Sequence, residues 1–164
     1  RFSTGEVGLT ASDPSVRQKM KHARSKGVSL PPPDAVLVGG RTCCRFSIEA
    51  LSDPLMIGLA LYENPSRERA HRGDSFPLAL GSSTGKVCQG GSRISWPGMQ
   101  GFGPGDTVDL LLDANSGRVE AKKNGDYLGT VAETGVTGQL CWVVSMGGLR
   151  HNAVRVESLD PDEF

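Results

Sequence analysis

Residues 105–131 read GDTVDLLLDANSGRVEAKKNGDYLGTV and predict three antiparallel strands joined by two tight turns. Val108, Leu110 and Leu112 alternate with mostly polar neighbours, which is the period-two pattern of a strand with one dry face. The sequence 115–117, Asn-Ser-Gly, then has the composition of a turn. The first strand is therefore expected to end close to Asp113.

The second turn of this segment is predicted at Asn124-Gly125. A two-residue type I′ hairpin turn needs positive φ at both central residues, and Asn-Gly meets that need at low cost. The register that follows places opposite charges together and apolar side chains together on one side of the hairpin. The expected cross-strand pairs are Lys123 with Asp126 and Ala121 with Leu128.

The order of these features resembles the central signature of SPRY domains: Gly-Asp, an apolar run ending in Leu-Leu-Asp, a Gly turn, Lys-Asn-Gly and Leu-Gly. The resemblance extends over about residues 36–157. It departs at Ala121, where the family usually has a large aromatic residue, and at Asp109, where a small or apolar residue is commoner. Further segments resemble the family in the expected order: 45–49 (RFSIE), 56–60 (MIGLA), 81–83 (GSS), 102–106 (FGPGD) and 140–146.

Composition and patterning predict an all-β chain. The chain of 164 residues contains 22 Gly and 10 Pro, with only 37% hydrophobic residues, which is typical of many short strands and turns. Residues 55–62 are apolar throughout and predict a strand buried on both faces. Some ten short strands imply a two-layer antiparallel β-sandwich, and the resemblance implies the SPRY, or concanavalin-like jelly-roll, version of it.

The sandwich is expected to occupy residues 35–158, with an arm at 1–34 and an acidic tail at 159–164. The arm predicts a short basic helix near 14–26, starting at Ser12-Asp13-Pro14, and then a stiff linker at Pro31-Pro32-Pro33. Two interpretations stay open: the helix docks on a partner, or it lies on its own domain. The residues expected to dock are Val16, Met20 and Ala23 on the apolar stripe, with Arg17 and Lys21 beside it.

Charge and hydropathy exclude several classes of protein. Eighteen basic and eighteen acidic residues cancel, which argues against nucleic acid as the main partner. No apolar run approaches membrane-spanning length, although peripheral attachment to a membrane complex stays open. The four cysteines match no zinc or redox spacing and are predicted to be buried and reduced. We therefore expect an intracellular, reducing location: cytoplasm, or a plastid or mitochondrial interior if a leader was cleaved.

No pattern in the sequence predicts an enzyme, a cofactor, a metal site or a small-molecule substrate. Residues 81–85, Gly-Ser-Ser-Thr-Gly, match a hydrolase motif, but a strand pattern rather than a helix follows, so a hairpin turn is predicted. Asp109 and Asp113 share a strand face but lie about 13 Å apart, too far for paired carboxylate chemistry. The histidines, which lie on the arm and in loops without metal-ligand spacing, are His22, His71 and His151.

The SPRY resemblance implies a non-catalytic module that binds other protein subunits or a peptide motif through loops at one end of the sandwich. By position, these loops are 63–75, 96–104 and 147–152. Arginine and aromatic side chains dominate the energetics of such interfaces. The predicted partner-binding residues are Tyr62, Arg67, Arg69, Arg72, Trp96, Met99, Phe102 and Arg150.

Three functions compete at this point. The first is a structural or accessory subunit of a larger protein assembly. The second is an adaptor that recruits substrates, for example for ubiquitin ligation. The third, a glycan-binding lectin-like domain, is less favoured because the sequence shows no calcium cluster. A stable stoichiometric complex would favour the first function, transient peptide binding the second, and glycan binding the third.

Overall fold

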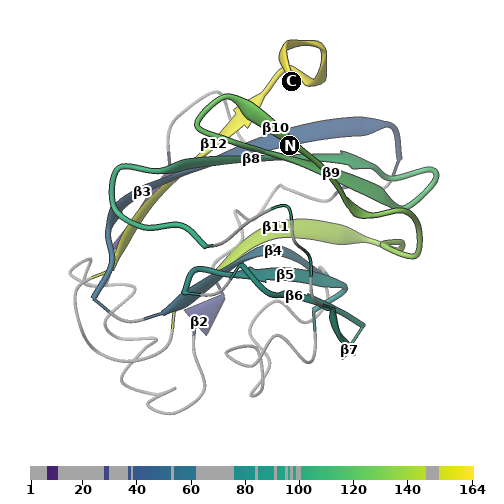
Figure 1. The fold of residues 1–164 in the computed structure, drawn as a ribbon. Helices are drawn as coiled ribbons and strands as arrows, with labels where there is room; N and C mark the ends of the chain where they lie inside the picture. The colour runs from purple at the N-terminus through teal and green to yellow at the C-terminus, as the bar shows by residue number, and fades with distance from the viewer. Residues whose placement is uncertain are drawn as a thin grey trace.

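Strands with alternating apolar residues form two antiparallel sheets that stack face to face in the computed structural model (Figure 1). This arrangement confirms the predicted two-layer β-sandwich. No helix among the described residues is long and apolar enough to cross a membrane. The structure describes residues 7–10, 28–29, 37, 39–52, 54–61, 76–83, 85–90, 92–94, 96, 98, 101–146 and 152–164.

The described strands form two six-stranded sheets, here named sheet A and sheet B. Sheet A has the order β1 (Val7–Thr10), β12 (Ala153–Leu159), β3 (Arg41–Ala50), β8 (Thr107–Asp113), β9 (Arg118–Lys123) and β10 (Asp126–Ala132). Sheet B has the order β2 (Val28–Ser29), β11 (Leu140–Met146), β4 (Leu55–Leu61), β5 (Leu78–Gly81), β6 (Val87–Gln89) and β7 (Ser92–Ile94). A short 3-10 helix, η2 (Pro161–Glu163), follows β12.

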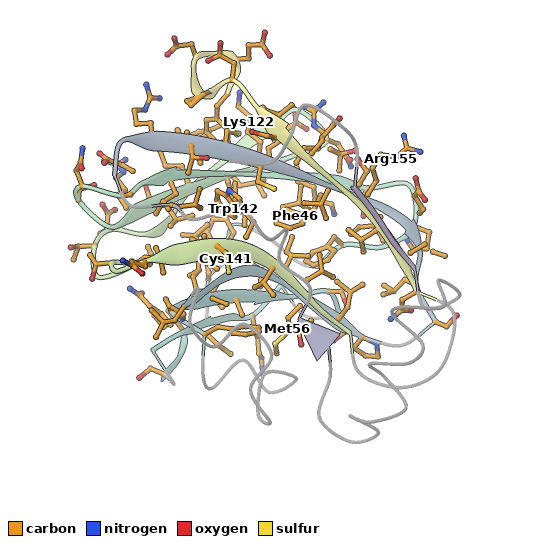
Figure 2. All side chains as sticks on the ribbon, turned by 180° about the vertical axis from the view of Figure 1, so that it is seen from behind. Phe46, Met56, Lys122, Cys141, Trp142 and Arg155 are labelled. Atoms are coloured by element: carbon orange, nitrogen blue, oxygen red, sulfur yellow. The ribbon has the colours of Figure 1, made fainter. Side chains whose placement is uncertain are left out.

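The core lies between the inner faces of the two sheets. Phe46 from β3 and Trp142 from β11 meet there edge to face, with ring centroids 6.1 Å apart (Figure 2). Both side chains are fully buried and belong to one apolar cluster that includes Leu110 and Leu59. Trp142 and Phe46 are among the largest fully buried side chains of the described residues, and each large aromatic removes about 150–250 Å² from water, so this contact joins the two sheets through a large apolar area.

A second apolar cluster lies on the outer face of sheet B. Its residues are mostly small, and each is nearly fully buried: Ala60, Phe76, Ala79, Cys88, Cys141 and Val143. Strand β4 is therefore buried on both faces up to Ala60, as its apolar sequence predicts, whereas Leu61 at its end is exposed.

All four cysteines are buried free thiols, as expected. Burial is the largest cause that raises the pKa of Cys43 to about 12 and the pKa of Cys141 to about 11. At neutral pH both stay protonated and behave as small apolar side chains.

The hairpin between β9 and β10 confirms the predicted turn and corrects half of the predicted register. Asn124 and Gly125 have φ of 52° and 86°, as a type I′ turn requires, and Lys123 pairs with Asp126. Ala121, however, pairs with Gly129 and not with Leu128, because the register shifts between Tyr127 and Gly129. Gly129 has φ of 111°, and a β-bulge commonly places glycine at such a position to absorb the extra residue.

The outer face of sheet A contains an ion pair that the sequence pattern did not predict. Asp109 on β8 is only 4% exposed, and its two carboxylate oxygens accept hydrogen bonds from Arg45 on β3 at 2.8 and 2.9 Å. Arg45 and Asp109 are direct cross-strand partners, and Glu157 lies 3.9 Å from the same guanidinium. The pair explains how a carboxylate is accommodated where the resembling family usually has a small or apolar residue.

Several predicted features lie outside the described residues. They are the helix near 14–26 and the arm-docking residues Val16, Met20, Ala23, Arg17 and Lys21, which stay predictions.

Gly125→Val should lower the free energy of unfolding by about 1–3 kcal/mol, because a β-branched residue is strained at positive φ. The matched control is Gly103→Val, since Gly103 has no positive φ and open space around it. Urea unfolding of both variants provides the measurement. Equal losses in the two variants would contradict the type I′ turn as the cause.

Arg45→Met should cost more stability than Asp109→Leu, because it leaves a buried carboxylate without its guanidinium. We expect a loss of about 1–3 kcal/mol for Arg45→Met, and the double variant should recover most of it, since an apolar pair often replaces a buried ion pair at little net cost. Denaturant unfolding of the two single variants and the double variant tests this order. Additive losses in the double variant would show that the two side chains act independently.

Candidate binding surface at one end of the sandwich

Strand register determines which loops share an end of the sandwich. Met146 pairs with Leu55 at one end of sheet B, and Leu140 pairs with Leu61 at the other. We name these the Leu55 end and the Leu61 end. The Leu55 end also receives the β5–β6 turn, the 101–106 loop and the β9–β10 turn, because β5 ends there and β8 begins there.

This register separates loops that the sequence analysis placed together. Segment 147–151 leaves β11 at the Leu55 end, and the chain from 95 to 106 enters β8 at that end. Segment 62–75, in contrast, leaves β4 after Leu61 and enters β5 close to Leu78, at the Leu61 end. The attachment points of the three predicted binding loops therefore lie at two ends of the sandwich.

A hydrogen-bonded network around Asp106 fixes the loop that precedes β8. One carboxylate oxygen of Asp106 accepts from the backbone N–H of Gly103 at 2.9 Å, and the other accepts from Asn124 Nδ2 at 2.9 Å. Lys123 Nζ lies 3.6 Å from the same carboxylate. The hydrogen bond from Asn124 is the largest cause that lowers the pKa of Asp106, with the Gly103 N–H and Lys123 adding to it.

The same loop is tied to both sheets. The Phe102 N–H donates to the Ser82 carbonyl of the β5–β6 turn at 2.8 Å, and Lys123 Nζ from β9 donates to the Gly101 carbonyl at 2.9 Å. Gly101 has φ of 119°, and a Cβ there would lie 2.7 Å from the Ser82 carbonyl oxygen, so glycine is required. The loop thus bridges the two layers and closes this end of the sandwich.

The Gly-Ser-Ser-Thr-Gly motif forms the hairpin turn that the sequence predicts. The Gly85 N–H donates to the Gly81 carbonyl at 2.9 Å, and strand β6 follows directly. Ser82 is buried, and its Oγ accepts from the Leu55 N–H at 2.9 Å. This strand–turn–strand context differs from the strand–turn–helix that holds a hydrolase nucleophile, and Ser82 has a structural hydrogen bond here.

Two predicted binding residues from the 96–104 loop can be placed. Trp96 is half-buried and packs against the core cluster. Its ring lies so close to Gly98 that a Cβ there would come within 2.6 Å of it. Phe102 is only 5% exposed and belongs to the core, so its ring offers little surface to a partner.

The other predicted binding residues lie outside the described part of the chain: Tyr62, Arg67, Arg69, Arg72, Met99 and Arg150.

Sequence reasoning missed the Asp106 network. Its members are 3 to 18 residues apart, as the contacts of Asp106 with Gly103 and Asn124 show. In the sequence, Asp106 and Asn124 are each typical of a turn and give no sign that they contact one another. Only the Gly-Asp and Lys-Asn-Gly elements of the SPRY resemblance could have indicated the contact between them. Among the described residues, no three His, Cys, Asp or Glu side chains gather closely enough to hold a metal ion.

Comparison with solved structures supports the fold. The crystal structure of the SPRY domain of human HERC1 matches with a TM-score of 0.63 and 17% sequence identity, covering 77% of this chain and 79% of that one. No family model matches the sequence, and no curated protein matches it. At this identity the likeness shows a SPRY-like fold.

Asp106→Asn should destabilise the chain at pH 6 and progressively less as the pH falls. Because the folded-state pKa of Asp106 is lowered, its stabilisation is present above the unfolded-state value of about 3.9 and is lost as pH falls through the folded pKa. The measurement is urea unfolding of wild type and variant at pH 6 and pH 3. Asp126→Asn, at the same hairpin but exposed, is the control and should change stability by less than about 0.5 kcal/mol. A stability difference for Asp106→Asn that stays constant over this range would contradict a charge-dependent network.

Proposed function

We propose that this SPRY-fold chain is a non-catalytic protein–protein interaction module that binds a protein or peptide partner at its Leu55 end. The observation that supports the proposal most is the Asp106 network, which holds a glycine- and proline-rich loop against both sheets. Binding residues concentrate on loops that a rigid scaffold positions. A loop held in one conformation loses less conformational entropy when a partner binds.

The side chains at this end suit recognition of a protein surface. Trp96 is a half-buried aromatic residue at the edge of the core, and interface energy concentrates on such anchors. Met99 lies in the same loop, and Arg150 lies in a segment attached to the same end; both stay predicted contributors. The arginines predicted at 67, 69 and 72 belong to a loop attached at the Leu61 end, so we propose them as a separate contact region.

The more specific proposal is a structural or accessory subunit held in a larger assembly. Within the arm, β1 and β2 pair with strands of the two sheets, so the additional docking element is the segment between them. Its apolar residues Val16, Met20 and Ala23 would contact other subunits, and Arg17 and Lys21 would add electrostatic attraction. Such a subunit has to co-elute with its assembly in stoichiometric amount during size-exclusion chromatography. A substrate-recruiting adaptor would instead elute alone and bind a peptide transiently.

A photo-crosslinking side chain at position 83 should capture the partner, and one at position 116 should not. Ser83 and Ser116 are both exposed turn serines, but they lie at the Leu55 end and the Leu61 end respectively. The full chain with benzoylphenylalanine at either position is irradiated in the native assembly, and the products are identified by mass spectrometry. Capture from position 116 alone would overturn the assignment of the binding surface to the Leu55 end.

A further inference from the structure

The C-terminal tail lies across the outer face of sheet A. It leaves β12 after Leu159, which pairs with Cys43 of β3, and η2 then lies against β3. Phe164 reaches β9 and β10, where its ring meets Tyr127 edge to face at 6.2 Å and Lys122 Nζ lies 4.6 Å from its centroid. The tail therefore crosses β3 and β8 within a few residues, on the face opposite to the core (Figures 1 and 2).

The surface under the tail has the chemistry of a recognition site for an acidic segment with an aromatic residue. Lys122 and Tyr127 are cross-strand partners, so they present a cation and an aromatic edge side by side. Arg41 at the start of β3 lies 3.7 Å from Asp162. Tyr127 Oη donates to Glu120 Oε1 at 2.5 Å, which fixes the orientation of its ring. A basic side chain thus contacts each end of the tail's Asp-Glu-Phe sequence.

The tail has a locally fixed conformation, but its contacts with sheet A are weak. Asp160 caps η2, because its side chain accepts from the Asp162 N–H at 2.9 Å, so the segment keeps its shape locally. Asp162 and Arg41 remain 88% and 53% exposed, and Tyr127 remains 55% exposed. Exposed ion pairs and cation–π contacts each contribute little in water. The contact can therefore open without loss of a strand.

We propose that Arg41, Lys122 and Tyr127 form a second binding surface and that residues 160–164 are its intramolecular ligand. The intermolecular partner of this surface is an acidic peptide in which an aromatic residue follows the acidic residues. The tail covers this surface until such a peptide displaces it. The charge complementarity of the face and the segment seated on it both point to this partner. The surface lies on the outer face of sheet A, although Lys122 and Tyr127 are close to the β9–β10 turn. The inference rests on the contacts of the tail and not on the Asp106 network, so it is independent of the proposed function.

The test measures binding of a fluorescent, amidated peptide, Asp-Pro-Asp-Glu-Phe, to the full chain by fluorescence polarisation. The wild-type tail should compete with it, whereas Phe164→Ala removes the competing ring and leaves the surface intact. If the tail occupies the site for about nine-tenths of the time, Phe164→Ala should bind the peptide roughly tenfold more tightly. Adding Lys122→Ala or Tyr127→Ala to Phe164→Ala should abolish that gain.

Two controls make the result specific. The first control adds Arg155→Ala to Phe164→Ala, which removes one positive charge from the same face, where Arg155 pairs with Glu49. The peptide affinity of this double variant should stay within about twofold of that of Phe164→Ala alone. A peptide with Ala in place of Phe should bind neither form. Equal affinity of wild type and Phe164→Ala, absence of binding to both, or binding that survives Lys122→Ala and Tyr127→Ala would each overturn the proposal.

Discussion

The contact between Phe46 and Trp142 is the interaction on which the other features of this molecule depend. It joins β3 of sheet A to β11 of sheet B with both rings fully buried. Because side chains alternate along a strand, fixing Phe46 inward also turns Cys44 and Ile48 inward and sends Cys43 and Arg45 outward. A shift of one residue in β3 would bury Arg45 in the core and expose the phenylalanine. The register of β3 therefore determines which side chains are available on the outer face of sheet A.

The local pattern was sufficient to predict the architecture but not its irregularities. Alternation in β8 and the Asn-Gly turn identified the strands correctly, because each signal is confined to a few neighbouring residues. The bulge before Gly129 was missed, since a glycine at positive φ and a glycine in a regular strand look the same in sequence. The Arg45–Asp109 pair was also missed, because it joins residues that are 64 positions apart.

The candidate site was predictable only in part, for a topological reason. A loop can be recognised from its composition. The end of the sandwich at which it lies depends on the direction of the strand that precedes it, and the composition of the loop does not contain that direction. The composition of the loops predicts a common site for 63–75 and 96–104, although the strands place their attachment points at opposite ends. Phe102 shows a similar limit: its N–H donates to the Ser82 carbonyl and its ring is buried in the core, and neither contact can be inferred from the composition of the loop.

The two outer faces of the sandwich differ in the kind of side chain that they carry. The outer face of sheet B has small, buried apolar residues such as Ala60 and Cys141, so a change there disturbs packing. The outer face of sheet A has paired charges, including Arg155 with Glu49. It also contains two apolar residues, Cys43 and Leu111, which face outward but are buried. Exposed charged side chains on that face, such as Arg41, can lose the partner that they contact without opening the core. A substitution of an exposed charged residue on sheet A should therefore disturb packing less than a substitution on the outer face of sheet B. The exception is the buried Asp109 with its partner Arg45.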